Sequence, residues 1–176
     1  MKYLASIFLL LLFISCGSVR VNYDFDHKTD FSSYTTYNYF DDMATGLNEL
    51  EEKRLLKAMD ITLRSKGLLF SEEPDILIDI KSTIYRSRPN NTVAVGLGGG
   101  GRSVGGGVSV GLPVGAPNIK RELRLDLVDA TKDMLIWQAV SVSGYKENNP
   151  PALKEQKMQE LIIKIFDKYP PKQRKK

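Results

Sequence analysis

The chain has 176 residues, of which 42% are hydrophobic and 26% charged, a length and composition that suit one globular domain. Lysine and arginine outnumber the acids by 25 to 21, but the tail 172–176 holds four basic residues and no acid. The excess positive charge therefore belongs to the tail, and a basic face for nucleic acid is excluded. A single cysteine excludes an intrachain disulfide, and a single histidine excludes a histidine metal cluster.

The N-terminus has the features of a targeting signal. An apolar run over residues 3–15 follows Lys2 and is shorter than the roughly 20 residues of a membrane-spanning helix, so it has the anatomy of a signal peptide. Its end, residues 13–16, resembles the lipobox of bacterial lipoproteins. We expect residues 1–15 to be removed and Cys16 to carry the lipid, with palmitate-like acyl chains. An uncleaved anchor helix and an ordinary secretory signal are the alternatives.

Gly17 follows the cysteine where an aspartate would favour the inner membrane, so sorting to the outer membrane is favoured. No acidic cluster, which would resemble a surface-export signal, stands beside the cysteine, and this favours the periplasmic face. That compartment offers no nucleic acid. The first strand pattern begins at residue 19, which leaves very little tether after the lipid.

The first half of the mature chain alternates between strand and helix patterns. Apolar and polar residues alternate over 19–25, aromatic residues and threonines fill 35–40, and isoleucines alternate over 76–85, so three strands are predicted. Asn48 and Glu51 resemble a capping box at the start of a helix over 48–66, which ends before Gly67.

The second half predicts a hairpin and a closing helix. Strands over 122–128 and 134–142 flank a turn at 129–133, and a helix with an apolar stripe begins at Pro150-Pro151 and ends before Pro170. We therefore expect an α+β fold, with a largely antiparallel sheet, two helices packed on one face and a glycine-rich insertion. The single domain should cover 16–171, followed by the basic tail.

Ten of the fourteen glycines lie in the insertion, residues 96–115. Matches to nucleotide-binding glycine motifs occur there without the strand before and helix after that such motifs need, so they are ascribed to chance. A surface loop is the preferred interpretation, because glycine weakens strands. The alternative is a protruding hairpin with one apolar face that contacts a partner through Val93, Val95, Arg102, Val108 and Val110.

The polar residues do not form a catalytic set. His27 is interpreted as a solvated turn residue, and the nearby Asp24, Asp26 and Asp30 lack the spacing of a calcium loop. We expect no metal, no cofactor and no enzymatic activity. Trp137 is assigned to the core. The sheet's exposed face should carry a charge ladder formed by Asp79, Lys81, Arg124 and Asp126.

Motifs distributed along the mature chain resemble the bacterial lipoprotein family called domain of unknown function 4136. The resemblance covers about residues 19–171 and rests on segments 21–24, 30–37, 63–68, 73–78, 125–129, 135–139 and 169–171, together with the glycine-rich middle. It implies a small lipid-anchored envelope domain and supplies no catalytic residue.

The leading hypothesis is a non-enzymatic interaction domain, anchored in the membrane by Cys16, with an unknown envelope protein or ligand as its partner. The alternative is a binding module for an envelope lipid, glycan or other small ligand, using a cleft between helices and sheet. A hydrolase is disfavoured, because only one histidine is present.

Overall fold

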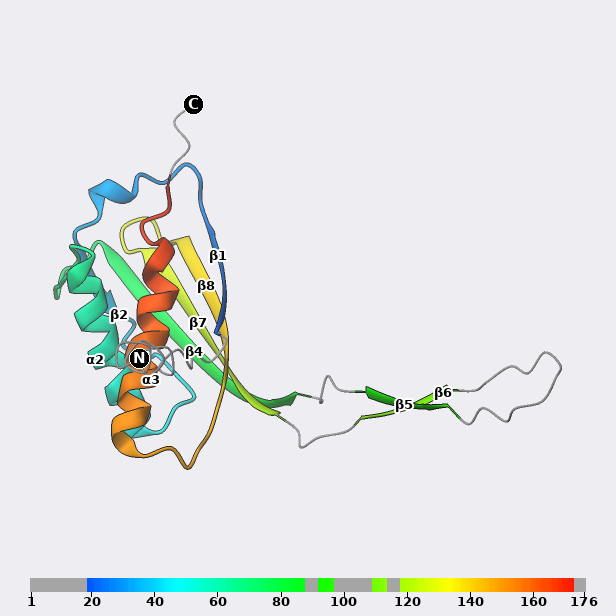
Figure 1. Cartoon of the computed structure of the whole chain (residues 1–176). Coiled ribbons are helices and arrows are strands. Elements are labelled where there is room, and N and C mark those ends of the chain that lie inside the picture. The colour runs from blue at the N-terminus through cyan, green and yellow to red at the C-terminus, as the bar shows by residue number, and fades with distance from the viewer. Residues whose placement is uncertain (1–18, 88–91, 97–108, 114–117, 173–176) are drawn as a thin grey trace, which may run out of the picture.

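The computed structural model describes residues 19–87, 92–96, 109–113 and 118–172. Its main body is a six-stranded sheet with the strand order β1-β8-β7-β4-β2-β3, with helices α2 and α3 lying on one face (Figure 1). The strands are β1 (Arg20–Phe25), β2 (Thr36–Tyr39), β3 (Leu69–Phe70), β4 (Ile76–Ser87), β7 (Asn118–Asp129) and β8 (Met134–Gly144), and the helices are α2 (Glu49–Ser65) and α3 (Pro151–Ile165). Within the described ranges, no helix combines the length and apolarity needed to cross a membrane.

All strand pairs in this sheet are antiparallel except those that β2 makes with β3 and β4. The predicted α+β class is therefore confirmed, and each predicted strand and helix is present within a few residues of its expected bounds. Two short 3-10 helices complete this main body, η2 (Phe31–Ser33) and η3 (Phe166–Lys168), the second of which continues α3.

Local signals explain the ends of α2. The Asn48 side chain accepts a hydrogen bond from the Glu51 backbone N–H at 3.0 Å, as an N-cap should. At the other end, Gly67 has φ +89°, and Leu68 N–H donates to the Leu63 carbonyl at 3.0 Å, which is a Schellman ending. The capping-box prediction was only half right, because the Glu51 carboxylate is bonded elsewhere.

The core fills the space between the helices and the sheet. Leu55, Met59 and Ile162 on the helices have no exposed surface, and neither have Ile78 and Leu125 on the central strands. The same layer continues through Ile76, Ile80, Leu123, Leu127, Ile136, Trp137, Ala139, Ile165 and Phe166. Packed aliphatic and aromatic side chains therefore occupy the layer between the helices and the sheet, where the alternative hypothesis placed a ligand cleft.

A bulge shapes the middle of the hairpin formed by β7 and β8. Leu127 lies opposite Trp137 but Val128 lies opposite Leu135, so Ile136 is an extra residue on β8. Ile136 and Trp137 are both buried although they are consecutive. The bulge thus allows two neighbouring side chains of one strand to enter the core.

The two ends of the glycine-rich region form a separate two-stranded ribbon. Strand β5 (Thr92–Gly96) pairs antiparallel with β6 (Ser109–Pro113), with Val95 opposite Val110 and Val93 opposite Leu112. Figure 1 shows this ribbon projecting away from the six-stranded sheet, beyond β4 and β7. The pairing is the one expected of the hairpin alternative, while residues 97–108 lie outside the described part.

Gly46 occupies a position that no other residue fits well. It has φ +69°, and a Cβ placed there would lie 2.7 Å from the Ser82 backbone oxygen. Replacing Gly46 with alanine should lower the free energy of unfolding by about 2–3 kcal/mol, since a left-handed conformation and a backbone clash are both imposed. Gly67→Ala is the matched control, because its φ is +89° but nothing lies within 4 Å of the added carbon. Urea unfolding that gave equal losses for both variants would contradict the steric account.

Candidate functional site

His27 and its acidic neighbours lie in and around the turn that follows β1. His27 lies in an exposed turn, with its ring against Phe25 at a centroid distance of 4.5 Å. Asp26 accepts hydrogen bonds from Lys28 N–H and Thr29 Oγ1, both at 3.0 Å, and Asp30 caps the turn η2 through Ser32. These bonds lower the pKa of Asp26 and Asp30, in Asp30 chiefly through the Ser32 hydroxyl. Across the described ranges, no group of three metal-ligating side chains occurs.

The charge ladder on the sheet face opposite the helices is confirmed. Asp79 lies opposite Asp126, and Lys81 lies opposite Arg124. The ion pairs form within each strand and not between the two strands: Lys81 pairs with Asp79 at 2.7 Å, and Arg124 pairs with Asp126 at 3.0 Å. Exposed pairs of this kind contribute little stability.

Asp129 anchors the turn between β7 and β8. Its buried carboxylate accepts hydrogen bonds from the Lys132 ammonium at 2.6 Å, the Tyr34 hydroxyl at 2.7 Å and the backbone N–H groups of Thr131 and Lys132. The Lys132 bond is the main reason that the pKa of Asp129 lies far below its usual range. Burial and the Asp129 carboxylate raise the pKa of Tyr34 to about 12. The hydrogen bond from Tyr34 to Asp129 joins the loop after η2 to the hairpin of β7 and β8. The segment that contains Phe31 and Tyr34 therefore has a structural role.

Asp129→Asn should reduce the free energy of unfolding by about 1–3 kcal/mol at neutral pH, because charged hydrogen bonds are lost from a buried group. The folded pKa is lowered, so the stabilisation is complete above the ordinary aspartate pKa of 3.8 and is lost as the pH falls further. The difference between wild type and variant should therefore shrink in urea titrations below about pH 4. Asp133→Asn in the same turn is the control and should leave the pH profile unchanged; a constant difference for Asp129→Asn would contradict the assignment.

A shallow groove runs along the exposed side of α2. It is lined by Lys53, Leu56, Lys57, Asp60, Ile61 and Arg64, which combine three cations, two apolar side chains and one carboxylate. We call this the α2 groove. Asp60 is fixed by Tyr37 and Tyr39, whose hydroxyls both donate to its Oδ1 at 2.8 Å. Burial, followed by these bonds, raises the pKa of both tyrosines well above the usual range.

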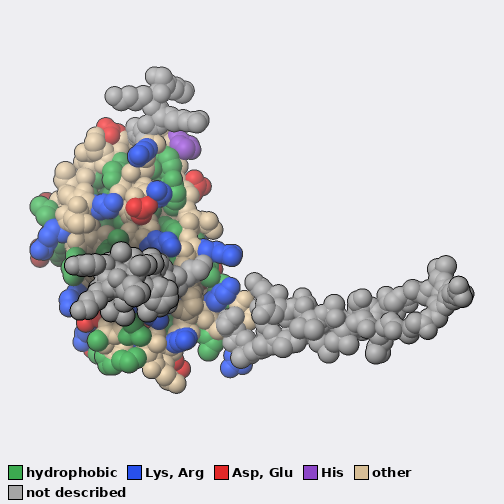
Figure 2. Space-filling view, in the orientation of Figure 1, with side chains coloured by type: hydrophobic (Ala, Val, Ile, Leu, Met, Phe, Trp, Pro, Cys, Tyr) green, Lys and Arg blue, Asp and Glu red, His purple; other side chains and the backbone are tan. Residues whose placement is uncertain are grey.

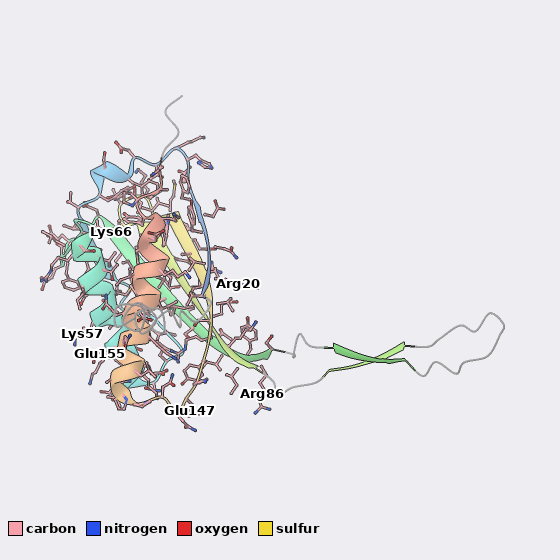
Figure 3. The ribbon with its side chains drawn as sticks, viewed as in Figure 1. Arg20, Lys57, Lys66, Arg86, Glu147 and Glu155 are labelled. Atoms are coloured by element: carbon pink, nitrogen blue, oxygen red, sulfur yellow. The ribbon has the colours of Figure 1, made fainter. Side chains whose placement is uncertain are left out.

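The cations of the α2 groove differ in their partners. Lys53 pairs with Glu49, and Lys57 reaches across to Glu155 on α3 at 2.6 Å, as Figure 3 shows. Arg64 makes no ion pair within the described part of the chain. The groove therefore has the chemistry to accept an amphipathic molecule with a negative group near Arg64.

A buried ion pair lies where α2 meets β7. The Arg121 guanidinium bonds to Glu51 Oε2, and only 7% and 6% of the two side chains are exposed. The Tyr145 hydroxyl donates to Glu51 Oε1 at 3.3 Å, and Arg121 Cζ lies 4.2 Å from the Tyr145 ring centroid. The Arg121 Nε and Ser82 Oγ atoms are buried and have no hydrogen-bond partner among the described residues. This cluster was not predicted; the one sequence signal is that Glu51 precedes Leu55 by four residues, on the apolar stripe of the helix.

The residues predicted to contact a partner fall in two groups. Val93, Val95 and Val110 belong to the ribbon of β5 and β6, where Val95 and Val110 are opposite each other. Arg102 and Val108 lie outside the described residues, as does the predicted lipid site Cys16.

One comparison with solved structures shows a similar fold at low identity. A PDZ domain protein from Parabacteroides distasonis ATCC 8503 matches with a TM-score of 0.58 and 12% identity, over 98% of this chain but only 41% of that chain. The PelC dodecamer from Paraburkholderia phytofirmans matches with a TM-score of 0.49 and 10% identity, over 86% of this chain and 95% of that chain. The comparison with curated proteins gave no match.

The family comparison covers nearly all of the described body. A protein-family model, described as a domain of unknown function (DUF4136), matches residues 21–171, from β1 to the segment after η3. This agrees with the motifs quoted from the sequence. The chain belongs to the DUF4136 family.

Proposed function

We propose that this protein is a lipid-anchored cell-envelope protein and acts as a non-enzymatic interaction domain on the periplasmic face of the outer membrane. The signal-peptide anatomy and the single cysteine that follows it support lipidation at Cys16. The observation that supports an interaction role is the ribbon of β5 and β6, which projects from the sheet (Figure 1). The proposal assigns no catalytic residue.

The ribbon has the properties of an unfinished sheet. A two-stranded hairpin is marginally stable in water, and its outer edges leave N–H and C=O groups free to pair. Its register sets Val93 opposite Leu112 and Val95 opposite Val110, so four aliphatic positions share one face. An envelope partner that covers this face or adds a strand to the ribbon would complete the structure.

The α2 groove favours a second candidate, the binding of a small envelope ligand. Leu56 and Ile61 offer apolar contact, and Arg64 offers a positive charge that is not paired within the described residues. A lipid or an acidic glycan fits this combination better than a neutral glycan does. Copurifying small molecules that are lost in Ile61→Ser/Arg64→Ser would support this candidate.

The interaction role is tested by crosslinking the tagged protein in its native membranes. We compare wild type with a variant that places threonine at Val93, Val95, Val110 and Leu112, and with a control, Ala94→Ser/Ser109→Thr, that alters alternate positions of the ribbon. A stoichiometric protein crosslinked in wild type and control but lost in the threonine variant is the expected result. Absence of a specific protein in all three samples would refute the interaction role and leave the ligand-binding candidate.

Lipidation has its own test. Wild-type protein should incorporate a labelled fatty acid and sediment with outer membranes, whereas Cys16→Ser should do neither. Wild type that stays in the soluble fraction without label would overturn the anchoring part of the proposal.

A further inference from the structure

The first described strand begins close to the proposed lipid. Four Cα-to-Cα steps separate Cys16 from Arg20, the first residue of β1, and a chain of that length spans at most about 14 Å. Whatever path residues 17–19 take, Arg20 must lie within that distance of the lipidated residue. The headgroup layer itself is several ångströms deep, so the start of β1 lies close to the headgroups.

Strand register shows which end of the sheet this is. Arg20 lies opposite Val142, Val142 opposite Glu122 and Glu122 opposite Thr83. Beyond this row, β4 and β7 continue to Ser87 and Asn118, from which the chain runs to β5 and β6. Arg20 therefore lies at the end of β1 that is nearer the ribbon, and Figure 3 shows Arg86 and Glu147 at the ribbon end, with Arg20 further along the sheet edge.

The surface of the ribbon end combines basic and apolar side chains. The exposed fractions of Ile84, Tyr85 and Ile119 are 47%, 39% and 40%. The basic residues around them are Arg20, Arg86, Lys120 and Lys146, and the acids are Glu122 and Glu147. Figure 2 shows Lys and Arg side chains gathered where the strands leave toward the ribbon. Basic residues with a tyrosine and isoleucines are typical of surfaces that contact lipid headgroups.

The opposite end of the sheet has the opposite charge. The turns at 26–30 and 129–133 and the start of β4 bring together five aspartates and two lysines there: Asp26, Asp30, Asp75, Asp129 and Asp133, with Lys28 and Lys132. The next row of the outer sheet face adds Asp24, Asp79 and Asp126. An anionic bilayer would repel these turns and attract the ribbon end of the sheet, so the charge of the sheet and the tether favour the same orientation.

We propose that the ribbon end of the sheet, through Arg20, Tyr85, Arg86, Ile119 and Lys120, lies on anionic lipid headgroups and holds the aspartate-rich end away from the membrane. This inference rests on the proposed lipid anchor at Cys16. The competing arrangement uses the basic tail, since Lys172 follows η3 at the aspartate-rich end. The two arrangements place opposite ends of the domain on the bilayer.

The test uses the full lipidated protein in vesicles of phosphatidylcholine mixed with phosphatidylglycerol. Because Cys16 is the only cysteine and its thiol is consumed by the lipid, an introduced cysteine gives a single labelling site. A fluorophore is placed at Ile119→Cys on the ribbon end or at Thr131→Cys on the opposite turn, and quenching by headgroup-attached quenchers is measured. We expect quenching at position 119 to exceed quenching at 131 by roughly two-fold or more, and to fall in 1 M salt, where the screening length is about 3 Å.

Charge variants separate orientation from anchoring. Arg20→Glu/Arg86→Glu/Lys120→Glu should abolish the excess quenching at 119 while the protein stays bound to vesicles. The control Lys28→Glu/Lys164→Glu/Lys172→Glu makes the same change of charge at exposed residues on the aspartate-rich end and should leave it intact. Thermal unfolding by circular dichroism checks that both triple variants remain folded.

Two results would overturn the proposal in distinguishable ways. Equal quenching at both probes, or stronger quenching at 131 than at 119, would show that the ribbon end is not on the headgroups although the anchor is intact. A free Cys16 thiol that reacts with the fluorophore would show that the lipid is missing, which refutes the proposed anchor together with the orientation built on it.

Discussion

Replacing Glu51 with alanine is expected to lower the free energy of unfolding by about 3–5 kcal/mol, because it leaves the Arg121 guanidinium buried without its counterion. The loss should exceed that of an ordinary helix-surface substitution, since both partners are more than nine-tenths buried. Tyr145 offers only its ring face and no negative charge in place of the carboxylate. Urea unfolding followed by circular dichroism at pH 7 measures the difference.

The control removes both charges. Glu51→Leu/Arg121→Met keeps apolar volume in the site, and a buried pair replaced in this way often costs little. The double variant should therefore be clearly more stable than Glu51→Ala. If the double variant were the less stable of the two, the loss would come from packing at the helix start and the electrostatic explanation would be wrong.

Trp137→Ala should cost about 3–5 kcal/mol, because it opens a cavity in the most densely aromatic part of the core. The indole has no exposed surface and stacks on Phe166 at a centroid distance of 5.4 Å, with Tyr169 edge-on at 5.6 Å. These contacts join β8 to the end of α3 and to η3. Losing them should loosen the C-terminal segment from the sheet, which amide hydrogen exchange over 158–169 would detect.

The variant Trp137→Phe separates the cost of the cavity from any cost of losing the indole N–H. The indole Nε1 is buried and has no hydrogen-bond partner in the described part of the chain, so phenylalanine forfeits none of the described hydrogen bonds and keeps an aromatic ring against Phe166. Its loss should be less than half that of the alanine variant. Equal losses for the two variants would indicate that the indole N–H has a role that the packing account leaves out.

Strands with a sustained alternation of apolar and polar residues, and helices with clear capping residues, could be predicted from the sequence. The alternation in β4 and β7, the Asn48 cap and the Gly67 ending each depend on residues close together in the chain, where propensity and local hydrogen bonds decide. Strand β3 could not be predicted in this way. Leu69 and Phe70 are too few for a period, and their strand exists because Leu69 N–H donates to the Thr35 carbonyl at 2.9 Å, far away in sequence.

The clusters around the candidate sites were also beyond local reasoning. Glu51 has the position of a capping-box residue, and only the fold brings Arg121 and Tyr145 to it. Asp60 likewise looks like a solvated helix residue until the strand β2 presents two tyrosine hydroxyls to it. Such partners are separated by 20 residues or more, so their pairing depends on the topology of the sheet.

The charge ladder also bears on how β4 and β7 find their alignment. If β7 slid by two residues, Asp79 would meet Arg124 and Lys81 would meet Glu122, and isoleucines would still face leucines on the inner side. Neither charge nor apolar matching therefore selects the native alignment. The selection falls to contacts at the strand ends, such as the bond from Ala130 N–H to the Asp75 carbonyl. Sequence changes in these end contacts, more than in the middle of the strands, should decide whether a chain of this family folds into a single arrangement.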